Sequence, residues 1–147
     1  MYKSIGALLM LMAVSANTAD QVIPDYKAKY MFTNSNVSME GVRELKTFAD
    51  GTRSLSFNAK IPLGKIDITS EFHENKNFIS TDLYSMTAKV TFLKQERILK
   101  FDRLENTLSS TGKFNWVEDL PASLEIFDPL NAQLQIRKMV AERLPLQ

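Results

Sequence analysis

The chain has 147 residues, 44% hydrophobic and 24% charged, with 18 Lys and Arg against 17 Asp and Glu. This length and apolar content are those of one ordinary globular domain rather than a disordered tail, and the near-zero net charge argues against a nucleic-acid binder. The absence of cysteine excludes a zinc finger, an iron–sulfur cluster, a disulfide scaffold and a cysteine nucleophile.

Residues 1–19 have the pattern of a cleavable secretory signal. Lys3 precedes an apolar run from Ile5 to Val14, and small and polar residues follow. About ten apolar residues are too few to cross a hydrocarbon core, which needs about twenty, so we expect cleavage and no transmembrane span afterwards. Cleavage after Ala16 and cleavage after Ala19 both fit the pattern. The mature domain, residues 20–147, is therefore expected in the periplasm.

From Tyr26 onward, apolar and polar residues alternate in short runs separated by turn residues, which is typical of half-buried antiparallel strands. Asp50-Gly51 is a strong hairpin signal. Gly41 interrupts the alternation and is a candidate β-bulge or a weak spot in its strand. The predicted strands lie at about 26–32, 37–45, 55–61, 66–72, 78–93, 97–101, 107–111 and 113–117, the fifth being one long strand.

Asp128-Pro129 predicts the start of a helix at 129–143, because the carboxylate can accept from free backbone N–H groups and proline suits the first turn. At 100° per residue, one arc of this helix is apolar and contains Arg137. The residues of the apolar arc are Leu130, Leu134, Val140, Ala141 and Leu144, with Ile136 at its edge. The residues opposite are Asn131, Gln135, Lys138 and Glu142.

The predicted sheet has more apolar surface than the helix can cover. About eight strands of about six residues present roughly 770 Å² per face, whereas a fifteen-residue helix covers about 220 Å². We therefore predict a mainly β fold: a strongly curved antiparallel meander, an open or closed barrel, with the C-terminal helix against its concave face. Its interior is either packed core or a ligand pocket.

Arg137 is the leading candidate for a binding residue, because an arginine on a buried apolar arc must reach water or be paired. It is paired either by a structural partner or by the carboxylate or phosphate of a bound amphiphile, with help from Gln133. Large inward residues either form packed core or line an apolar site. The candidates for that lining are Tyr26, Tyr30, Tyr84, Phe57 and Phe92.

Several segments together resemble a known family of exported envelope proteins, domain-of-unknown-function family thirty-one-oh-eight. These segments are 26–30, 40–43, 70–72, 100–102 and above all Phe127-Asp128-Pro129-Leu130-Asn131-Ala132-Gln133-Leu134-Gln135-Ile136-Arg137. The resemblance implies a secreted β-rich fold akin to lipoprotein-carrier half-barrels and no established activity. Usual members continue with more strands after the helix. The chain is therefore a shortened relative, a fragment, or half of a dimer that completes its sheet with a second copy.

Catalytic patterns are weak. His73 is the sole histidine, and we interpret it as a solvated residue at a hairpin end, with no metal site, no cofactor and no nucleophile motif. Asp67, Glu71 and Asp82 are interpreted as outward-facing charges rather than glycosidase carboxylates. The basic stretch 94–103 (Lys94, Arg97, Lys100 and Arg103) is either a solvated edge strand or a surface attracted to an anionic membrane.

The first functional hypothesis is a non-catalytic periplasmic protein that binds or carries an apolar or lipid-like molecule. The second is a structural or interaction module of the cell envelope with a filled core, which docks a partner protein or a second copy through an open sheet edge. A hydrolase is a remote third hypothesis. The volume inside the curved sheet separates the first two.

Overall fold

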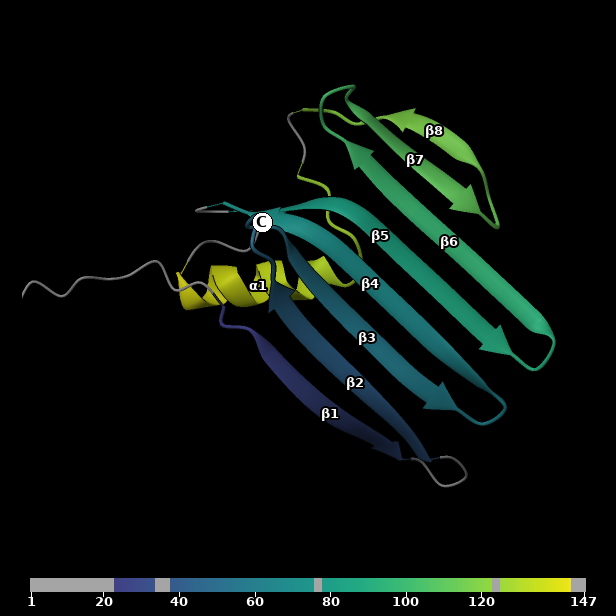
Figure 1. The fold of residues 1–147 in the computed structure, drawn as a ribbon. Helices are drawn as coiled ribbons and strands as arrows, with labels where there is room; N and C mark the ends of the chain where they lie inside the picture. Colours follow the sequence, from purple (N-terminus) through teal and green to yellow (C-terminus); the bar gives the residue numbers. More distant parts are fainter. Residues whose placement is uncertain (1–22, 34–37, 76–77, 123–124, 144–147) are drawn as a thin grey trace, which may run out of the picture.

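The computed structural model describes residues 23–33, 38–75, 78–122 and 125–143. The predicted signal segment 1–19, the turn at 34–36 and Leu144 lie outside these residues. The described chain forms one antiparallel sheet in which each strand pairs with its neighbours in sequence, followed by one helix (Figure 1). The elements are β1 (Tyr26–Thr33), β2 (Ser38–Thr47), β3 (Arg53–Ile61), β4 (Gly64–Glu74), β5 (Ile79–Val90), β6 (Leu93–Asp102), β7 (Thr107–Gly112), β8 (Trp116–Asp119) and α1 (Asn131–Ala141).

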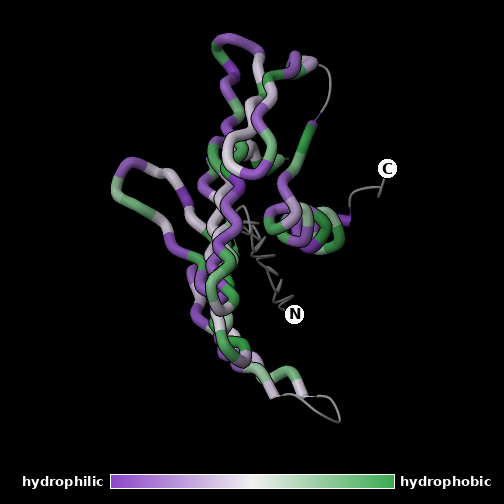
Figure 2. Tube along the Cα trace, turned by 90° about the vertical axis from the view of Figure 1, so that its right-hand side faces the viewer, coloured by the Kyte–Doolittle hydropathy of each residue, from purple (hydrophilic) through white to green (hydrophobic). Residues whose placement is uncertain are grey.

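This architecture confirms the predicted mainly β meander with a C-terminal helix. Strands β1 and β8 are the two edges and do not pair with one another, so the sheet is open rather than a closed barrel. Figure 2 shows the sheet close to edge-on, with α1 on one side of it. Within the described residues, no helix has the length and apolar character needed to span a membrane.

The two faces of the sheet differ in polarity because strand side chains alternate with a period of two. On the face toward α1, here called the helix-side face, Leu45 pairs with Leu55, and Phe57 with Ile68. The opposite face, here called the polar face, carries mostly charged and hydroxyl residues, with Glu44 opposite Ser56, for example. One-sided burial of this kind is usual for antiparallel sheets.

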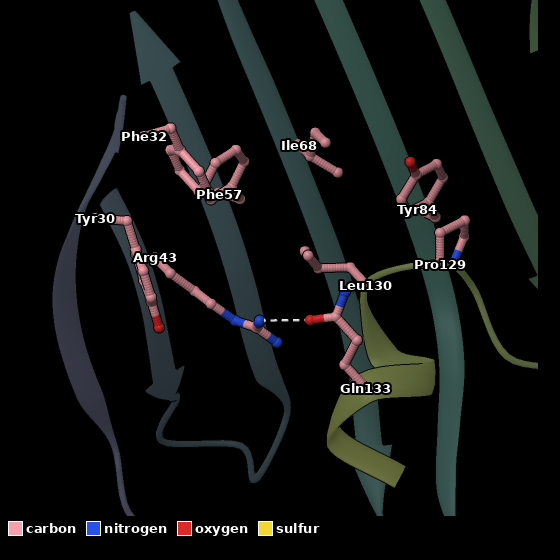
Figure 3. Close-up of a pocket in the computed structure, with 9 residues that line it drawn as sticks. All are labelled: Tyr30, Phe32, Arg43, Phe57, Ile68, Tyr84, Pro129, Leu130 and Gln133. Carbon is pink, nitrogen blue, oxygen red and sulfur yellow. Dashed lines mark hydrogen bonds between the residues drawn. The ribbon is translucent and has the colours of Figure 1, made fainter. Parts of the chain in front are cut away.

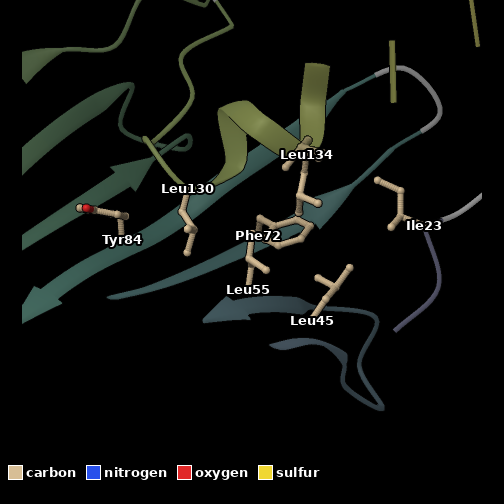
Figure 4. Packing of buried hydrophobic residues seen from close by; sticks show 8 residues of the cluster. Ile23, Leu45, Leu55, Phe72, Tyr84, Leu130 and Leu134 are labelled. Atoms are coloured by element: carbon tan, nitrogen blue, oxygen red, sulfur yellow. The ribbon is translucent and has the colours of Figure 1, made fainter. Parts of the chain in front are cut away.

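The hydrophobic core lies at one end of the sheet, under α1. Phe72 and Leu55 have no exposed surface, and Leu134 of α1 is 2% exposed. Figure 4 shows Leu130 and Leu134 pointing from the helix toward Phe72 and Leu55. The cluster consists of Ile23, Leu45, Leu55, Phe72, Ile79, Tyr84, Leu130 and Leu134. The other end of the helix-side face has no helix over it (Figure 1).

The predicted orientation of the helix is confirmed for Leu130 and Leu134, which are buried, but is wrong at other positions, including Arg137, which is exposed rather than part of a buried arc. Asn131, Gln135 and Lys138, which were expected to face solvent, are buried against the sheet. Val140, expected in the buried arc, is 61% exposed, and Ala141 is also exposed.

The reason is that the sheet offers polar partners to α1. Gln135 Oε1 accepts from the backbone N–H of Ile79 at 2.9 Å, and Lys138 Nζ lies 2.9 Å from a carboxylate oxygen of Glu74. Pairing the Ile79 N–H and the Glu74 carboxylate stabilises the fold more than burying additional aliphatic surface of the helix would, because an unpaired buried N–H or carboxylate costs free energy.

Two strand predictions also change. The long strand predicted at 78–93 ends at Val90, because the chain reverses at Thr91 and Phe92 before Val90 pairs with Leu93. No Gly, Pro, Asn or Asp marks this turn, and Thr91 takes a positive φ of 51°. Phe92 is therefore fully exposed at a hairpin tip instead of facing the interior. The last strand lies at Trp116–Asp119 rather than 113–117.

Gly41 is not a bulge. It pairs in regular register with Tyr30 on one side and Ala59 on the other, and the register shift lies instead between Glu71 and Phe72. A Cβ at position 41 would come within 2.8 Å of the Phe57 ring. Glycine is present here because an aromatic ring lies directly over the backbone.

Candidate ligand-binding cavity

A cavity of about 450 Å³ opens between the helix-side face and the start of α1. Figure 3 shows its lining residues projecting from β1 to β5 and from the first turns of the helix. They are Tyr30, Phe32, Arg43, Phe57, Ile68, Tyr84, Pro129, Leu130 and Gln133. A second hollow of about 310 Å³ shares Tyr30, Arg43 and Gln133 with it and adds Tyr26, Ala28, Leu134 and Arg137.

The structure thus brings together six of the seven predicted site residues, and Phe92 is the exception. Tyr30, Tyr84, Phe57 and Gln133 line the first cavity, whereas Tyr26 and Arg137 line the second. Their proximity is established; a role in binding a ligand stays a prediction.

Asp128 positions the helix end of the cavity. Its Oδ1 accepts from the backbone N–H groups of Leu130 and Asn131 at 2.8 and 3.0 Å, the contacts expected of a carboxylate before a helix. The helix itself spans Asn131–Ala141, with Leu130 at its N-cap, rather than the predicted 129–143. Its Oδ2 accepts from the hydroxyls of Ser70 at 2.6 Å and Thr81 at 3.0 Å. This buried carboxylate therefore joins the first turn of the helix to β4 and β5, and holds Gln133 over the sheet.

The far wall of the cavity is aromatic. The rings of Phe32 and Phe57 meet edge to face with centroids 6.4 Å apart, and Tyr30 stacks on Phe32 at 6.3 Å. Phe32 is 46% exposed and Tyr30 is 41% exposed. Rings this open to solvent are accessible to an apolar molecule.

Arg43 is the principal cation in the cavity, and sequence analysis missed it. One of its guanidinium N–H groups donates to Gln133 Oε1 at 2.7 Å (dashed in Figure 3), while its buried Nε has no hydrogen-bond partner among the described residues. No carboxylate in the described part of the chain lies within salt-bridge distance of it. The sequence did contain a pattern that could have identified Arg43. Regular alternation through Met39, Gly41 and Leu45 places Arg43 on the same face as these residues, which is the apolar face of the sheet.

Arg137 is exposed and lines the second hollow. Of the predicted alternatives, its exposure matches the one in which the side chain reaches water, and no carboxylate among the described residues lies within salt-bridge distance of it. Two guanidinium groups therefore line the second hollow without a counter-charge from the described chain: that of Arg43, which also lines the first cavity, and that of Arg137. They create a local positive potential beside an apolar wall.

Tyr84 closes the other side of the cavity. It is 6% exposed, and burial of its ring raises the pKa of the hydroxyl above the usual 10.0, with a further upward contribution from the nearby Asp128 carboxylate. Burial acts in this direction because it disfavours the charged phenolate. Tyr84 thus presents a neutral hydroxyl at physiological pH.

The titratable residues of the polar face form no such site. His73 Nδ1 lies 2.7 Å from Asp82 Oδ2, and its Nε2 lies 3.5 Å from the Thr52 hydroxyl. The order resembles a catalytic triad, but the Thr52–His73 separation is long for activation of a nucleophile and the His73 side chain is 60% exposed. None of these residues lines either hollow. The described residues contain no cluster of three or more His, Asp or Glu suited to a metal ion.

No family model, curated protein or solved structure matches the chain. The resemblance to domain-of-unknown-function family thirty-one-oh-eight therefore stays a prediction.

Proposed function

We propose that the chain is a non-catalytic periplasmic protein that binds or carries a lipid-like molecule with an anionic head. The observation that carries this proposal is the cavity of about 450 Å³, in which an aromatic wall faces an arginine without a counter-charge. Its volume falls within the range of about 300–1,000 Å³ that is usual for small-molecule sites.

The polar end of the ligand is assigned by charge. A carboxylate or phosphate placed between Arg43 and Arg137 would accept charge-assisted hydrogen bonds, which are stronger than the neutral bond that Arg43 makes to Gln133. Gln133 lines both hollows and its amide nitrogen can donate to the same head group.

The apolar end of the ligand fits the opposite wall. Phe32, Phe57 and Ile68 offer aromatic and aliphatic surface, and the alternation of β3 and β4 continues this surface through Ala59 and Ile66. A hydrocarbon tail along this wall would remove apolar area from water on both sides, at about 25 cal/mol per Å².

A structural or interaction module of the cell envelope is the second candidate. The edge of β1, which pairs with no other described strand besides β2, favours it, since an edge strand can add a strand from a partner protein or a second copy. The cavity of about 450 Å³ favours the binding protein instead, because docking through an edge strand makes no use of it. Light scattering of the ligand-free chain tests for a dimer.

The binding proposal is tested with a fluorescent fatty acid and with native mass spectrometry of the purified chain. We expect saturable uptake of the fatty acid, and weaker binding of the corresponding fatty alcohol, which lacks the charge. Arg43→Gln should reduce affinity for the fatty acid by about tenfold or more, because hydrogen bonds to charged groups contribute about 1.5–3 kcal/mol. The affinity for the alcohol should change little.

Lys29→Gln is the matched control. It removes one positive charge from β1 next to Tyr30, but on the polar face. We expect affinity for the fatty acid to be nearly unchanged. Absence of any bound or exchangeable lipid, or an equal loss in Lys29→Gln and Arg43→Gln, would contradict the proposal.

A further inference from the structure

Two of the turns that join the strands, 60–65 and 89–94, lie at the end of the sheet farthest from α1, and a third, 112–115, points in the same direction but is level with Arg97 of β6. In an antiparallel meander the turns that follow odd-numbered strands lie at one end, and those that follow even-numbered strands at the other. Segments 60–65, 89–94 and 112–115, here called the tip edge, follow β3, β5 and β7. The first two are linked by a hydrogen bond from the Thr91 N–H to the Leu63 carbonyl, at 2.9 Å.

The tip edge exposes large apolar side chains. Phe92 is 102% exposed, Leu63 77%, Leu93 71% and Phe114 54%. Leu63 adopts a positive φ of 64°, at a turn position where glycine or asparagine is favoured. An apolar residue is thus held at the outermost point of a turn where a polar one would fit the backbone better.

The tip edge is also basic. Its segments contain five lysines and no acidic residue. The corresponding turns at the other end, 48–52, 74–78 and 102–106, contain four acidic and two basic residues. The tip lysines are Lys60, Lys65, Lys89, Lys94 and Lys113.

Part of this charge lacks an acidic partner. Lys65 and Lys94 contact Asp67 and Glu96 at 2.7 and 2.8 Å. No carboxylate within the described ranges lies at salt-bridge distance from Lys60, Lys89 or Lys113, although Lys89 is close enough to Glu96 to contribute to the lowered pKa of that carboxyl.

We propose that the tip edge docks the protein on an anionic membrane surface, with Leu63, Phe92 and Leu93 inserted among the lipid head groups. Charge complementarity selects this partner: lysines near an anionic bilayer contribute about 1 kcal/mol each, and exposed leucine and phenylalanine gain by leaving water. Lysines on both sides of the apolar residues, at 60 and 65 and at 89 and 94, fit an interface whose interior is apolar and whose surface is charged.

The geometry connects this edge to the cavity. On the helix-side face, Ile61 of β3 and Val90 of β5 both pair with Gly64, and Ile66 pairs with Ala59 and Ala88. An apolar path therefore runs from the cavity to the tips. Docking itself depends on the tip residues alone and does not require the proposed ligand.

Site-specific labelling tests the proposal in the full chain, which has no cysteine of its own. Phe92→Cys and Leu104→Cys are each labelled with a polarity-sensitive fluorophore; Leu104 is 94% exposed in the turn between β6 and β7, at the opposite end. With vesicles of phosphatidylcholine and phosphatidylglycerol in equal parts, we expect a blue shift at position 92 and none at 104. Vesicles of phosphatidylcholine alone should produce little shift at either position.

Charge variants test whether docking depends on the lysines of the tip edge or on the total positive charge of the protein. The triple variant Lys60→Gln, Lys89→Gln, Lys113→Gln should weaken docking at least about tenfold. The matched triple variant Lys27→Gln, Lys46→Gln, Lys100→Gln removes the same charge elsewhere and should change the affinity for vesicles less than about threefold.

Absence of a shift at position 92, equal shifts at 92 and 104, or equal losses of affinity in the two triple variants would overturn the proposal. Arg43→Gln should dock normally, so failure of ligand binding and failure of docking are distinguishable.

Discussion

At the scale of single residues, Arg43 and Tyr84 line the same cavity but contribute different chemical groups to it. Arg43 supplies a charge whose hydrogen-bond partner is a neutral amide, and Tyr84 supplies a hydroxyl that burial keeps neutral. A site with a cation on one wall and apolar or neutral groups on the others distinguishes an anionic head from an uncharged one. Phe92 looked equivalent to Tyr84 in the sequence pattern, but it lies at a turn where it has no cavity to line.

Tyr84 leads to a prediction about pH. Its folded pKa is raised above 10.0, so the folded state retains the proton longer than the unfolded state, and stability should fall as pH rises through and above 10.0. Tyr84→Phe cannot lose a proton, and its free energy of unfolding should fall less steeply over the same range. Urea unfolding of both proteins on either side of pH 10.0 measures the difference; identical pH dependence would contradict the assignment.

At the scale of elements, α1 is held to the sheet by polar contacts as much as by leucines. The side chains of Glu74, Arg53 and Lys138 are all less than 10% exposed, and Glu74 contacts both cations. Lys138 also donates to the carbonyl of Asn75 at 2.8 Å. This network joins the helix to the ends of β3 and β4, and so keeps α1 over one end of the sheet.

Glu74 should therefore matter more than Lys138 to stability. Glu74→Gln leaves the buried Lys138 without a counter-charge and leaves Arg53 only the half-exposed Asp25 carboxylate at 3.4 Å, so it should cost about 3–5 kcal/mol of the free energy of unfolding. Lys138→Met leaves the Glu74–Arg53 pair in place and should cost clearly less. Glu40→Gln, which loses an exposed 3.8 Å pair with Lys29, is the control, with an expected cost below about 1 kcal/mol. Urea unfolding at neutral pH compares the three; equal costs for Glu74→Gln and Glu40→Gln would show that the network is not stabilising.

At the scale of the whole molecule, α1 covers only part of the helix-side face of the sheet. One short helix lies over one end of an eight-stranded sheet, and the cavity lies beside that helix, where apolar surface continues beyond its cover. A bound hydrocarbon would complete this layer. Binding and folding are therefore expected to be linked, because a ligand that binds only the folded state shifts the unfolding equilibrium.

Fatty acid present at about one hundred times its dissociation constant should raise the free energy of unfolding by about 2.7 kcal/mol. The same concentration should stabilise Arg43→Gln much less, since its affinity is lower. Thermal unfolding with and without the fatty acid measures both shifts. An equal shift in the two proteins would place the bound lipid somewhere other than beside Arg43.

The alternation of residues from Tyr26 onward was sufficient to predict an antiparallel meander, because a period of two is a local property of extended chain. Asp128-Pro129 predicted the helix start to within two residues for a similar reason, since the Asp128 carboxylate accepts from neighbouring backbone N–H groups. The Thr91-Phe92 turn was missed because neither residue type marks a turn locally.

The sequence by itself therefore determined the strand pattern, the apolar excess of one face and the start of the helix, which all depend on residues close together in the chain. Only the tertiary structure decided which side of α1 is buried, because that depends on polar partners such as Glu74, 64 residues from Lys138. It likewise decided that Arg43 meets Gln133, 90 residues away, over an aromatic wall. Contacts between distant segments depend on packing and charge balance across the whole sheet, which local patterns do not record.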